Sequence, residues 1–361
     1  MRYSEFKPLI EAVKGREYNH LEDNVFFYGS EGAQNAVEIL KKLGSDSSDV
    51  AIKWDGNPTV YWGREQDGTF VLVGKNGWGK QMAKSADELS NFIKNSGKGE
   101  DWRERFGNEM AAIYKIMEVA TPPEFRGYVY GDLLYHPGKP YSVTEGGIEF
   151  TPNLVTYTVN TKSKLGQRIA KSKVGVVVHS KFDEFGSKQG TPISNVDELN
   201  SDNVVVLGQT YVTHQPNIDT KEVKNIESLI NSYGQEIDKF LAPIKGLSDL
   251  SNIIYTYVNQ TSKSKNLEQL ENNFFTWLSS SKVSAGKQKK IAELNDTYPK
   301  ALPGIFKLVK TIMVVKDHII DQLDNADTDV KASTDGKKGG EGYVALGSKT
   351  KLVPRTRWVP N

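Results

Sequence analysis

The segment with the clearest chemical potential is Lys53-Trp54-Asp55-Gly56, which follows the apolar run Val50-Ala51-Ile52. The run predicts a short strand, and Asp-Gly predicts a turn directly after it. A lysine at a strand end can reach into a cleft, and the glycine lets a ligand approach the backbone closely. Lysine amines are protonated at neutral pH, so a lysine nucleophile needs burial and neighbouring positive charge. The alternative interpretation is a solvated lysine entering a surface turn.

Two further lysines, Lys349 and Lys351, could supply that positive charge. They are two positions apart in a predicted strand, so both side chains should point to one face. The alternative is an edge strand that its lysines protect from unwanted pairing. Glu341 precedes this strand and could orient a lysine or hold a metal ion. Its alternative role is to balance Lys337 and Lys338 at the end of a loop.

Short apolar runs and amphipathic segments indicate the elements that must position these residues. Asp67-Gly68 predicts a hairpin turn between two of the strands. Amphipathic spacing predicts helices over residues 4–14, 31–43, 84–95, 101–119 and 161–171. Apolar and β-branched runs predict strands over residues 50–53, 59–62, 69–73, 127–135, 154–159, 174–179, 204–207 and 211–213.

The pattern of apolar residues changes in the second half of the chain. Residues 219–325 show helical periodicity and lack the short apolar and β-branched runs of strands, which predicts a helical subdomain. Residues 325–340 are polar and rich in Gly and Lys, which predicts a mobile loop. Strand texture then returns at residues 342–346 and 349–353, with a tight hairpin turn at Gly347-Ser348.

This order of elements predicts an α+β fold. We expect residues 1–218 and 326–361 to form one domain of antiparallel sheets with flanking helices. We expect residues 219–325 to be an all-helical subdomain inserted between strands of that domain.

Composition narrows the functional classes. The 361 residues carry 46 Lys and Arg against 45 Asp and Glu, so any basic surface must be local. The run 282–290 is one such surface, although a solvated helix end explains its lysines equally well. The absence of cysteine excludes disulfides and thiolate nucleophiles. No apolar run approaches the roughly 18 residues of a membrane span, and the start lacks a signal core, so we expect a cytoplasmic protein without membrane partners.

The order of several short motifs resembles that of the covalent lysine nucleotidyltransferases, which include ATP-dependent DNA and RNA ligases and mRNA capping enzymes. That superfamily has its nucleophile in Lys-x-Asp-Gly. A basic residue before Gly, a strand ending in Gly-Glu, a purine-stacking aromatic residue, Glu-Gly-aromatic-Val and Lys-x-Lys follow. The similar residues here, in the same order, are Lys53 to Gly56, Lys75-Asn76-Gly77, Gly131-Asp132, Tyr157, Glu341-Gly342-Tyr343-Val344 and Lys349-Thr350-Lys351. The resemblance covers about residues 50–213 and 340–353.

Three features of this sequence differ from the pattern of the superfamily, and they indicate which of its members the chain resembles. Asp132 is one methylene shorter than the usual Glu, and Pro58 stands where DNA ligases commonly place Arg. The chain ends about ten residues after Lys351, which leaves no room for the C-terminal OB domain of DNA ligases and capping enzymes. The pattern is therefore most similar to an RNA ligase that lacks this domain, and it would fit a phage-encoded enzyme acting in the host cytoplasm.

The resemblance implies an ATP-grasp-like nucleotidyltransferase domain in which Lys53 attacks ATP and carries AMP covalently. It implies Mg²⁺ held by Glu341 and Asp132. It implies an acceptor nucleic acid with a 5′-phosphate and a 3′-hydroxyl, for which Lys80, Arg355 and Arg357 are candidate contacts beside the aromatic Trp78 and Trp358. The implied nucleotide-binding residues are Ile52, Lys53, Asp55, Gly56, Lys75, Asp132, Tyr157, Glu341, Lys349 and Lys351.

The implied function is an ATP-dependent polynucleotide ligase, with RNA ahead of DNA, acting as a monomer. One alternative is a capping-type guanylyltransferase or another nucleotidyltransferase. A different class is a non-catalytic relative that binds a nucleotide or nucleic acid, with the helical segment as a docking surface. Asp55 is expected to orient the motif loop, and His136 and His179 are expected to lie at the surface or in packing, because this chemistry does not need them.

Overall fold

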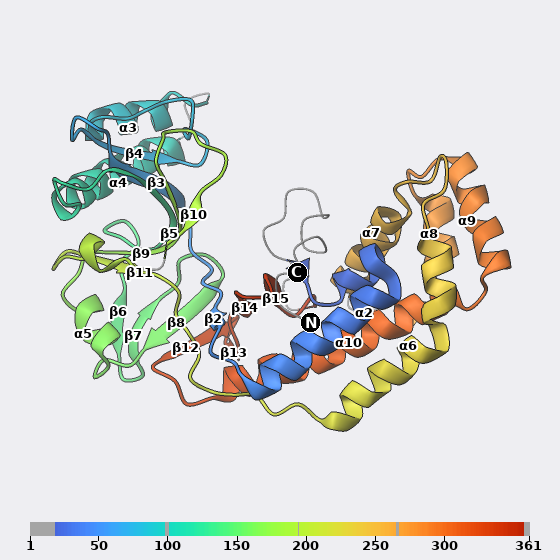
Figure 1. The fold of residues 1–361 in the computed structure, drawn as a ribbon. Helices are drawn as coiled ribbons and strands as arrows, with labels where there is room; N and C mark the ends of the chain where they lie inside the picture. The colour runs from blue at the N-terminus through green and yellow to red at the C-terminus, as the bar shows by residue number, and fades with distance from the viewer. Residues whose placement is uncertain (1–18, 98–100, 194, 265–266, 357–361) are drawn as a thin grey trace. The chain divides into compact units, whose positions relative to one another are not determined.

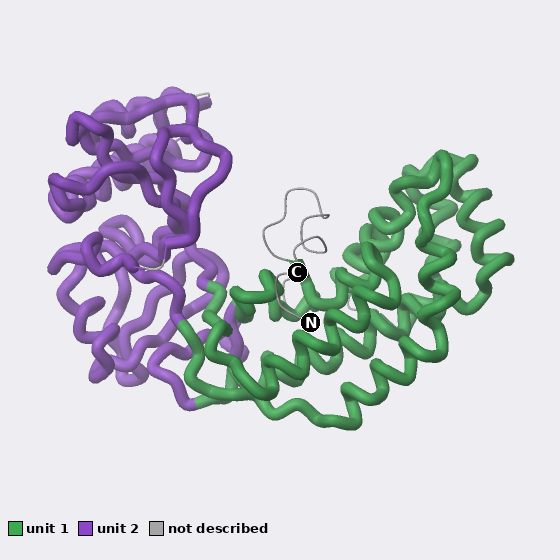
Figure 2. The backbone as a smooth tube through the Cα atoms, in the orientation of Figure 1, with its two compact units in different colours: residues 1–53, 211–326, 341–361 green, residues 54–210, 327–340 purple. Residues whose placement is uncertain are grey.

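A computed structural model describes residues 19–97, 101–193, 195–264 and 267–356, so the helix expected over 4–14 lies outside the described residues. The chain forms two compact units, each assembled from segments that are distant in sequence (Figure 2). Unit 1 comprises Met1–Lys53, Tyr211–Ala326 and Glu341–Asn361. Unit 2 comprises Trp54–Thr210 and Asp327–Gly340.

Unit 1 is built mainly from helices, which confirms the helical character predicted for 219–325. Three long helices, α2, α6 and α10, run side by side (Figure 1). Their apolar residues recur at helical spacing, so each helix buries one stripe against the others. The helices of the unit are α2 (Asp23–Ser45), α6 (Thr220–Leu241), α7 (Leu250–Lys263), η3 (Leu267–Gln269), α8 (Phe274–Ser280), α9 (Ala285–Thr297) and α10 (Ala301–Asn325).

Helix α2 is interrupted at Gly29, which explains why the helix predicted over 31–43 covers only part of it. Gly29 has a φ of 57°, which interrupts the helical conformation and which a glycine adopts readily. Asp238 of α6 then accepts hydrogen bonds from the Ser30 backbone N–H at 2.7 Å and from the Ser30 hydroxyl at 2.5 Å. A carboxylate from a distant helix therefore caps the second half of α2.

A four-stranded sheet completes unit 1, in the order β1-β15-β14-β2. The hairpin predicted around Gly347-Ser348 is confirmed, since β14 and β15 pair antiparallel. The strand predicted over 211–213 is wrong, because Tyr211 forms only an isolated bridge with Ala51. The strands are β1 (Asn19–His20), β2 (Val50–Ile52), β14 (Tyr343–Ala345) and β15 (Thr350–Leu352).

The two units divide the chain differently from the predicted domains. The segment 219–325 does not have a core of its own, because α6 and α10 pack on α2 from the start of the chain. The small sheet shares that core through residues such as Val50, Tyr343 and Leu352. Helical periodicity marks a stripe to be buried, but it does not tell which part of the chain covers it.

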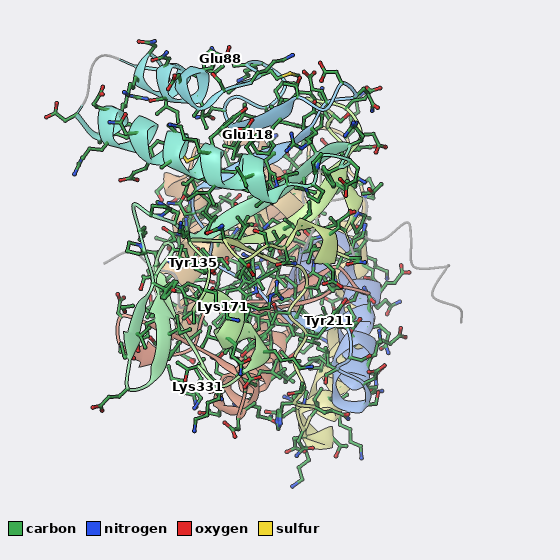
Figure 3. The ribbon with its side chains drawn as sticks, turned by 90° about the vertical axis from the view of Figure 1, so that its left-hand side faces the viewer. Glu88, Glu118, Tyr135, Lys171, Tyr211 and Lys331 are labelled. Carbon is green, nitrogen blue, oxygen red and sulfur yellow. The ribbon has the colours of Figure 1, made fainter. Side chains whose placement is uncertain are left out.

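Unit 2 contains a six-stranded sheet in the order β10-β9-β5-β3-β4, with β11 pairing parallel to β9. Helices α3 (Ala86–Lys94) and α4 (Asp101–Ala120) pack side by side, and Figure 3 labels Glu88 on the first and Glu118 on the second. Apolar residues of the helices and of the sheet form one core. The strands are β3 (Thr59–Arg64), β4 (Phe70–Gly74), β5 (Gly127–Tyr135), β9 (Val174–Phe182), β10 (Thr191–Pro192) and β11 (Val204–Leu207), with η2 (Asp197–Leu199) before the last.

A second sheet of unit 2 has the order β13-β12-β8-β7-β6. Its strands β12 (Val330–Thr334) and β13 (Lys337–Lys338) correct the prediction of a mobile loop over 325–340. Asp335 and Gly336 have φ values of 50° and 73°, which form the tight turn of this hairpin. Its other elements are β6 (Ser142–Thr144), β7 (Gly147–Phe150), β8 (Val155–Val159) and helix α5 (Lys164–Ile169). Together the units form a mixed α+β protein, as predicted.

Candidate active site

Lys53 and Glu341 are two motif residues that the fold of unit 1 brings together. Strands β2 and β14 pair antiparallel with Ile52 opposite Tyr343, so Lys53 and Glu341 lie just beyond paired strand ends. The Lys53 backbone N–H donates to the Gly342 carbonyl at 3.0 Å, and the Lys53 ammonium forms an ion pair with the Glu341 carboxylate. The two side chains are 27% and 22% exposed. A partly exposed amine beside a carboxylate can meet an electrophile, with the carboxylate placed to take the amine's proton.

Lys351 lies on the same face of this sheet as Lys53. The register joins Ala51, Val344 and Lys351 in one row across β2, β14 and β15. Lys53 directly follows β2, and its backbone N–H continues the pairing with the Gly342 carbonyl at 3.0 Å, so the alternation extends to Lys53 and its side chain shares a face with that of Ala51. The other face of the sheet packs against the helical core. On that face Leu352 is fully buried and Ile52 is half-buried. A second cation on the face of Lys53 suits the binding of phosphate.

Lys349 does not share that arrangement. It precedes β15 and has a φ of 49°, a turn conformation, and its side chain is exposed. Its backbone N–H donates to the Leu346 carbonyl at 3.1 Å. The expectation that Lys349 and Lys351 point to one face by strand alternation is therefore wrong, because alternation holds only inside a strand.

In unit 2, Asp55 fixes the loop that follows Lys53 in sequence. Its carboxylate accepts hydrogen bonds from the Asn153 side-chain amide at 3.0 Å and from the Leu154 backbone N–H at 2.9 Å. Its own backbone N–H donates to the Tyr157 hydroxyl oxygen at 2.6 Å. Asp55 therefore joins the motif loop to the start of strand β8, and its carboxylate is occupied by backbone and amide donors.

Tyr157 is a core residue. Its ring is 0% exposed and packs against Trp54, with ring centroids 4.5 Å apart, and against Phe150 at 5.7 Å. A purine needs a free ring face, so the expected stacking role of Tyr157 is wrong. Strand β8 alternates buried and half-buried positions, with Val155, Tyr157 and Val159 facing inward. The alternation is visible in the sequence and could have indicated this burial.

Gly56 lies against Asp132 of strand β5. A Cβ atom at Gly56 would stand 2.5 Å from the Asp132 Cβ, so the absence of a side chain at Gly56 makes room for Asp132. The sequence predicts instead that this glycine makes room for a ligand. The Thr59 hydroxyl donates to Asp132 Oδ1 at 2.5 Å, and His179 Nε2 lies 2.9 Å from Oδ2. Each Asp132 oxygen therefore has a hydrogen-bond partner from a neighbouring strand.

His179 is a functional candidate that the sequence did not indicate. Its side chain is 33% exposed, and a carboxylate on one ring nitrogen orients an imidazole so that the other can exchange protons or bind a ligand. The pairing depends on a register shift between Tyr130 and Gly131 where β5 meets β9, which no sequence pattern specifies. His136 is buried, as one of its expected roles requires, and burial lowers its pKa to about 4.

The two implied magnesium ligands, Glu341 and Asp132, belong to different units of the fold. Within the described ranges, no cluster of three or more His, Asp or Glu side chains could hold a metal ion. Asp132 accepts one hydrogen bond on each oxygen, from Thr59 and from His179, and each oxygen keeps a second lone pair for a metal ion. Protein Mg²⁺ sites commonly use one or two carboxylates together with substrate phosphates and water. Glu341 fits such a site as its single carboxylate.

The turn after β4 carries two of the expected cations, Lys75 and Lys80, and both are exposed. Trp78, the aromatic residue beside them, is half-buried. Its ring stacks on Tyr61 with centroids 4.2 Å apart, and its indole N–H donates to the Ser187 carbonyl at 3.0 Å. The turn is therefore anchored by its tryptophan and presents its lysines.

Arg355 is not a surface cation, and the expectation that it contacts nucleic acid is wrong. It is 8% exposed and forms ion pairs with Glu22 and Asp23 inside unit 1. A guanidinium buried in these ion pairs cannot reach a phosphate at the surface without breaking them. Arg357 and Trp358 lie outside the described residues.

Three lysines of the run 282–290 have partners within unit 1. Lys287 pairs with Asp249 at 2.6 Å, Lys289 with Glu293 at 3.8 Å, and the Lys290 ammonium donates to the Lys245 carbonyl at 2.7 Å. These contacts favour the solvated helix end over a phosphate site.

The comparisons with known proteins place the chain in a family. Residues 17–359 match the model of a family described as a family of unknown function, DUF6267, so the chain belongs to that family. Neither the curated proteins nor the solved structures contain a significant match. Across the described helices, none is both long and apolar enough to cross a lipid bilayer.

Proposed function

We propose that this protein is an ATP-dependent polynucleotide ligase that works through a covalent lysyl-AMP on Lys53. The observation that carries the proposal is the ion pair between Lys53 and Glu341, residues from opposite ends of the chain. They correspond to the first and a late motif of the lysine nucleotidyltransferases, and their order along the chain is the order in that superfamily. A lysine that only enters a surface turn does not require a carboxylate partner from a strand far away in the sequence.

In the proposed first step, the Lys53 amine attacks the α-phosphorus of ATP. A phosphorus–nitrogen bond forms, the bond to the bridging oxygen of the β-phosphate breaks, and pyrophosphate leaves. Before the attack, the Lys53 ammonium passes one proton to the Glu341 carboxylate, which lies in contact with it, and the second proton that the nitrogen loses as the phosphorus–nitrogen bond forms goes to the departing pyrophosphate. Lys351, on the same face of the sheet, stabilises the negative charge that grows on the α-phosphate. A magnesium ion bound through Glu341 and the phosphates would supply further charge neutralisation.

In the later steps AMP moves to a strand end. An oxygen of the acceptor's 5′-phosphate attacks the same phosphorus, the phosphorus–nitrogen bond breaks, and Lys53 recovers its proton. A 3′-hydroxyl then attacks the activated 5′-phosphate, AMP leaves, and a phosphodiester bond remains. Pro58, which stands where DNA ligases place arginine, favours RNA as the strand.

The test is the intact mass of the purified protein after incubation with ATP and Mg²⁺. We expect the mass to rise by one AMP in the wild type and to stay unchanged in Lys53→Arg, which keeps the charge but is the wrong nucleophile. GTP run in parallel separates this proposal from capping-type chemistry. Folded, nucleotide-free protein that gains no mass with ATP would refute the proposal and leave a non-catalytic binding protein. Nicked RNA, single-stranded RNA and nicked DNA then identify the acceptor, and we expect RNA.

A further inference from the structure

Unit 2 contains a cavity of about 470 Å³ where helices α3 and α4 meet the ends of strands β3 and β4. Its volume lies in the range of about 300 to 1,000 Å³ that small-molecule sites occupy. Every described residue that lines the cavity belongs to unit 2.

The floor of the cavity is apolar and aromatic. Phe92 from α3 and Phe106 from α4 line it, and the buried Leu89 and Met110 lie beside them. Trp102, in the first turn of α4, also lines the cavity and is 47% exposed. Rings and aliphatic chains of this kind bind a planar aromatic group better than a sugar or an ion.

The rim of the cavity is polar. Its exposed side chains are Asn57, Lys75, Asn76 and Gln81. Within the part of the chain that the structure describes, none of these four side chains forms a hydrogen bond or an ion pair with another residue. Three amides and one ammonium therefore surround an aromatic floor with their hydrogen-bonding capacity available to a ligand.

Arg103 adds a second, positioned cation. Its guanidinium donates to the Ser96 hydroxyl at 2.7 Å and lies 4.4 Å from the ring centroid of Trp102. This cation–π contact holds the charge at the cavity wall next to the aromatic surface. Aromatic rings, amide groups and two cations around one cavity match the ring face of a base, its polar edge and the phosphate of a nucleotide.

We propose that this cavity is a non-covalent binding site for a nucleotide with a 5′-phosphate. The base lies among Phe92, Phe106 and Trp102, amides of the rim bind its polar edge, and Lys75 and Arg103 bind the phosphate. A hydrocarbon ligand would leave the four rim side chains unused, and a sugar without a base would leave the aromatic floor unused. The inference does not depend on the chemistry of Lys53, and the nucleotide is either free or the terminal nucleotide of a strand.

The first experiment locates the ligand by photolabelling the full chain with 8-azido-AMP. AMP has no pyrophosphate to lose, so it cannot form the covalent lysyl-AMP by the proposed reaction. We expect the label on peptides from the turn 75–81 or from α3 and α4, and we expect excess AMP to prevent it. Labelling confined to peptides of unit 1, or no specific labelling, would overturn the proposal.

Variants then test the assigned residues by equilibrium binding of AMP. Trp102→Ala should weaken binding about 5- to 140-fold through the loss of base stacking, and Lys75→Gln should weaken it about tenfold or more through the loss of a charged contact to the phosphate. Lys115→Gln is the matched control, because Lys115 is an exposed cation of α4 that does not line the cavity. Unchanged binding in both Trp102→Ala and Lys75→Gln, with melting curves like the wild type, would overturn the proposal.

Competition separates the two sources of the nucleotide. If a 5′-phosphorylated oligonucleotide prevents the labelling better than AMP does, and the unphosphorylated oligonucleotide does not, the cavity binds strand ends. If AMP prevents the labelling better, the cavity binds a free nucleotide. The AMP adduct on Lys53 is measured on the same variants. A protein that forms no adduct but binds AMP in the cavity would refute the ligase and leave this inference standing, and the reverse result would do the opposite.

Discussion

Removing Glu22 alone should strongly destabilise unit 1, because it holds two buried cations. Glu22 and Lys316 are both 0% exposed. The Lys316 ammonium donates to the two Glu22 oxygens at 2.8 and 2.9 Å, and Arg355 Nε donates to the first at 2.6 Å. Burial acts to raise the pKa of Glu22, but Lys316 and Arg355 together hold it well below its usual value.

The magnitude follows from which charge is left unpaired. Glu22→Gln keeps the shape but leaves Lys316 buried without a counter-charge, which costs about 3–5 kcal/mol. Lys316→Met leaves two buried carboxylates, Glu22 and Asp23, to share Arg355, so it should also cost about 3–5 kcal/mol. The double variant has no unpaired ammonium, so we expect it to be about 2 kcal/mol more stable than Glu22→Gln alone.

The assay is urea unfolding followed by far-UV circular dichroism, which reports chiefly on the helices of unit 1. Glu118→Gln, an exposed acid on α4, is the control and should change stability by less than about 0.5 kcal/mol. If the two single effects add within about 0.5 kcal/mol in the double variant, the buried-pair reasoning is refuted. The network also concerns function, because it anchors Arg355, which follows the strand that carries Lys351.

Three further predictions concern the site and its surroundings. Glu341→Gln should slow formation of the AMP adduct about 10²-fold in a rapid-quench assay, because it removes the proton acceptor of Lys53, whereas Glu118→Gln should not change that rate. Gly56→Ala should destabilise unit 2 by about 1–3 kcal/mol in urea unfolding, since its Cβ would collide with Asp132; an unchanged midpoint would contradict the packing. Burial lowers the pKa of His136 to about 4 from 6.5, so the unfolded chain binds the proton first. The free energy of unfolding should therefore fall by up to about 3 kcal/mol as the pH drops from 6.5 to 4. His136→Gln should flatten that fall in a pH series, and an equally steep series would refute the assignment.

Elements with strong local signals could be predicted from the sequence. Strand β5 has the predicted ends, Gly127 and Tyr135, because a dense aromatic and aliphatic run admits few alternatives. The helices between 219 and 325 follow from apolar spacing alone. The order of motifs led to Lys53 and Glu341, and the strand register places them side by side.

The features that the sequence did not indicate depend on distant partners. Strand β12 is polar, and it is a strand because it pairs along its length with β8. Asp132 and His179 meet only through the register of β5 and β9, and Arg355 is buried because Glu22 and Asp23 stand at the start of α2. The burial of Tyr157 is a different case, because its alternation with Val155 and Val159 indicates an inward-facing core residue and outweighs the motif resemblance.

The measurement that tests the central claim most directly is the position of the adduct. Protein incubated with ATP and Mg²⁺ is digested, and the peptide that carries AMP is sequenced by mass spectrometry. We predict AMP on Lys53, through an acid-labile phosphorus–nitrogen bond, and unmodified Lys75, Lys349 and Lys351. AMP on another lysine, or no modified peptide from folded protein, would contradict the assignment of Lys53 as the nucleophile.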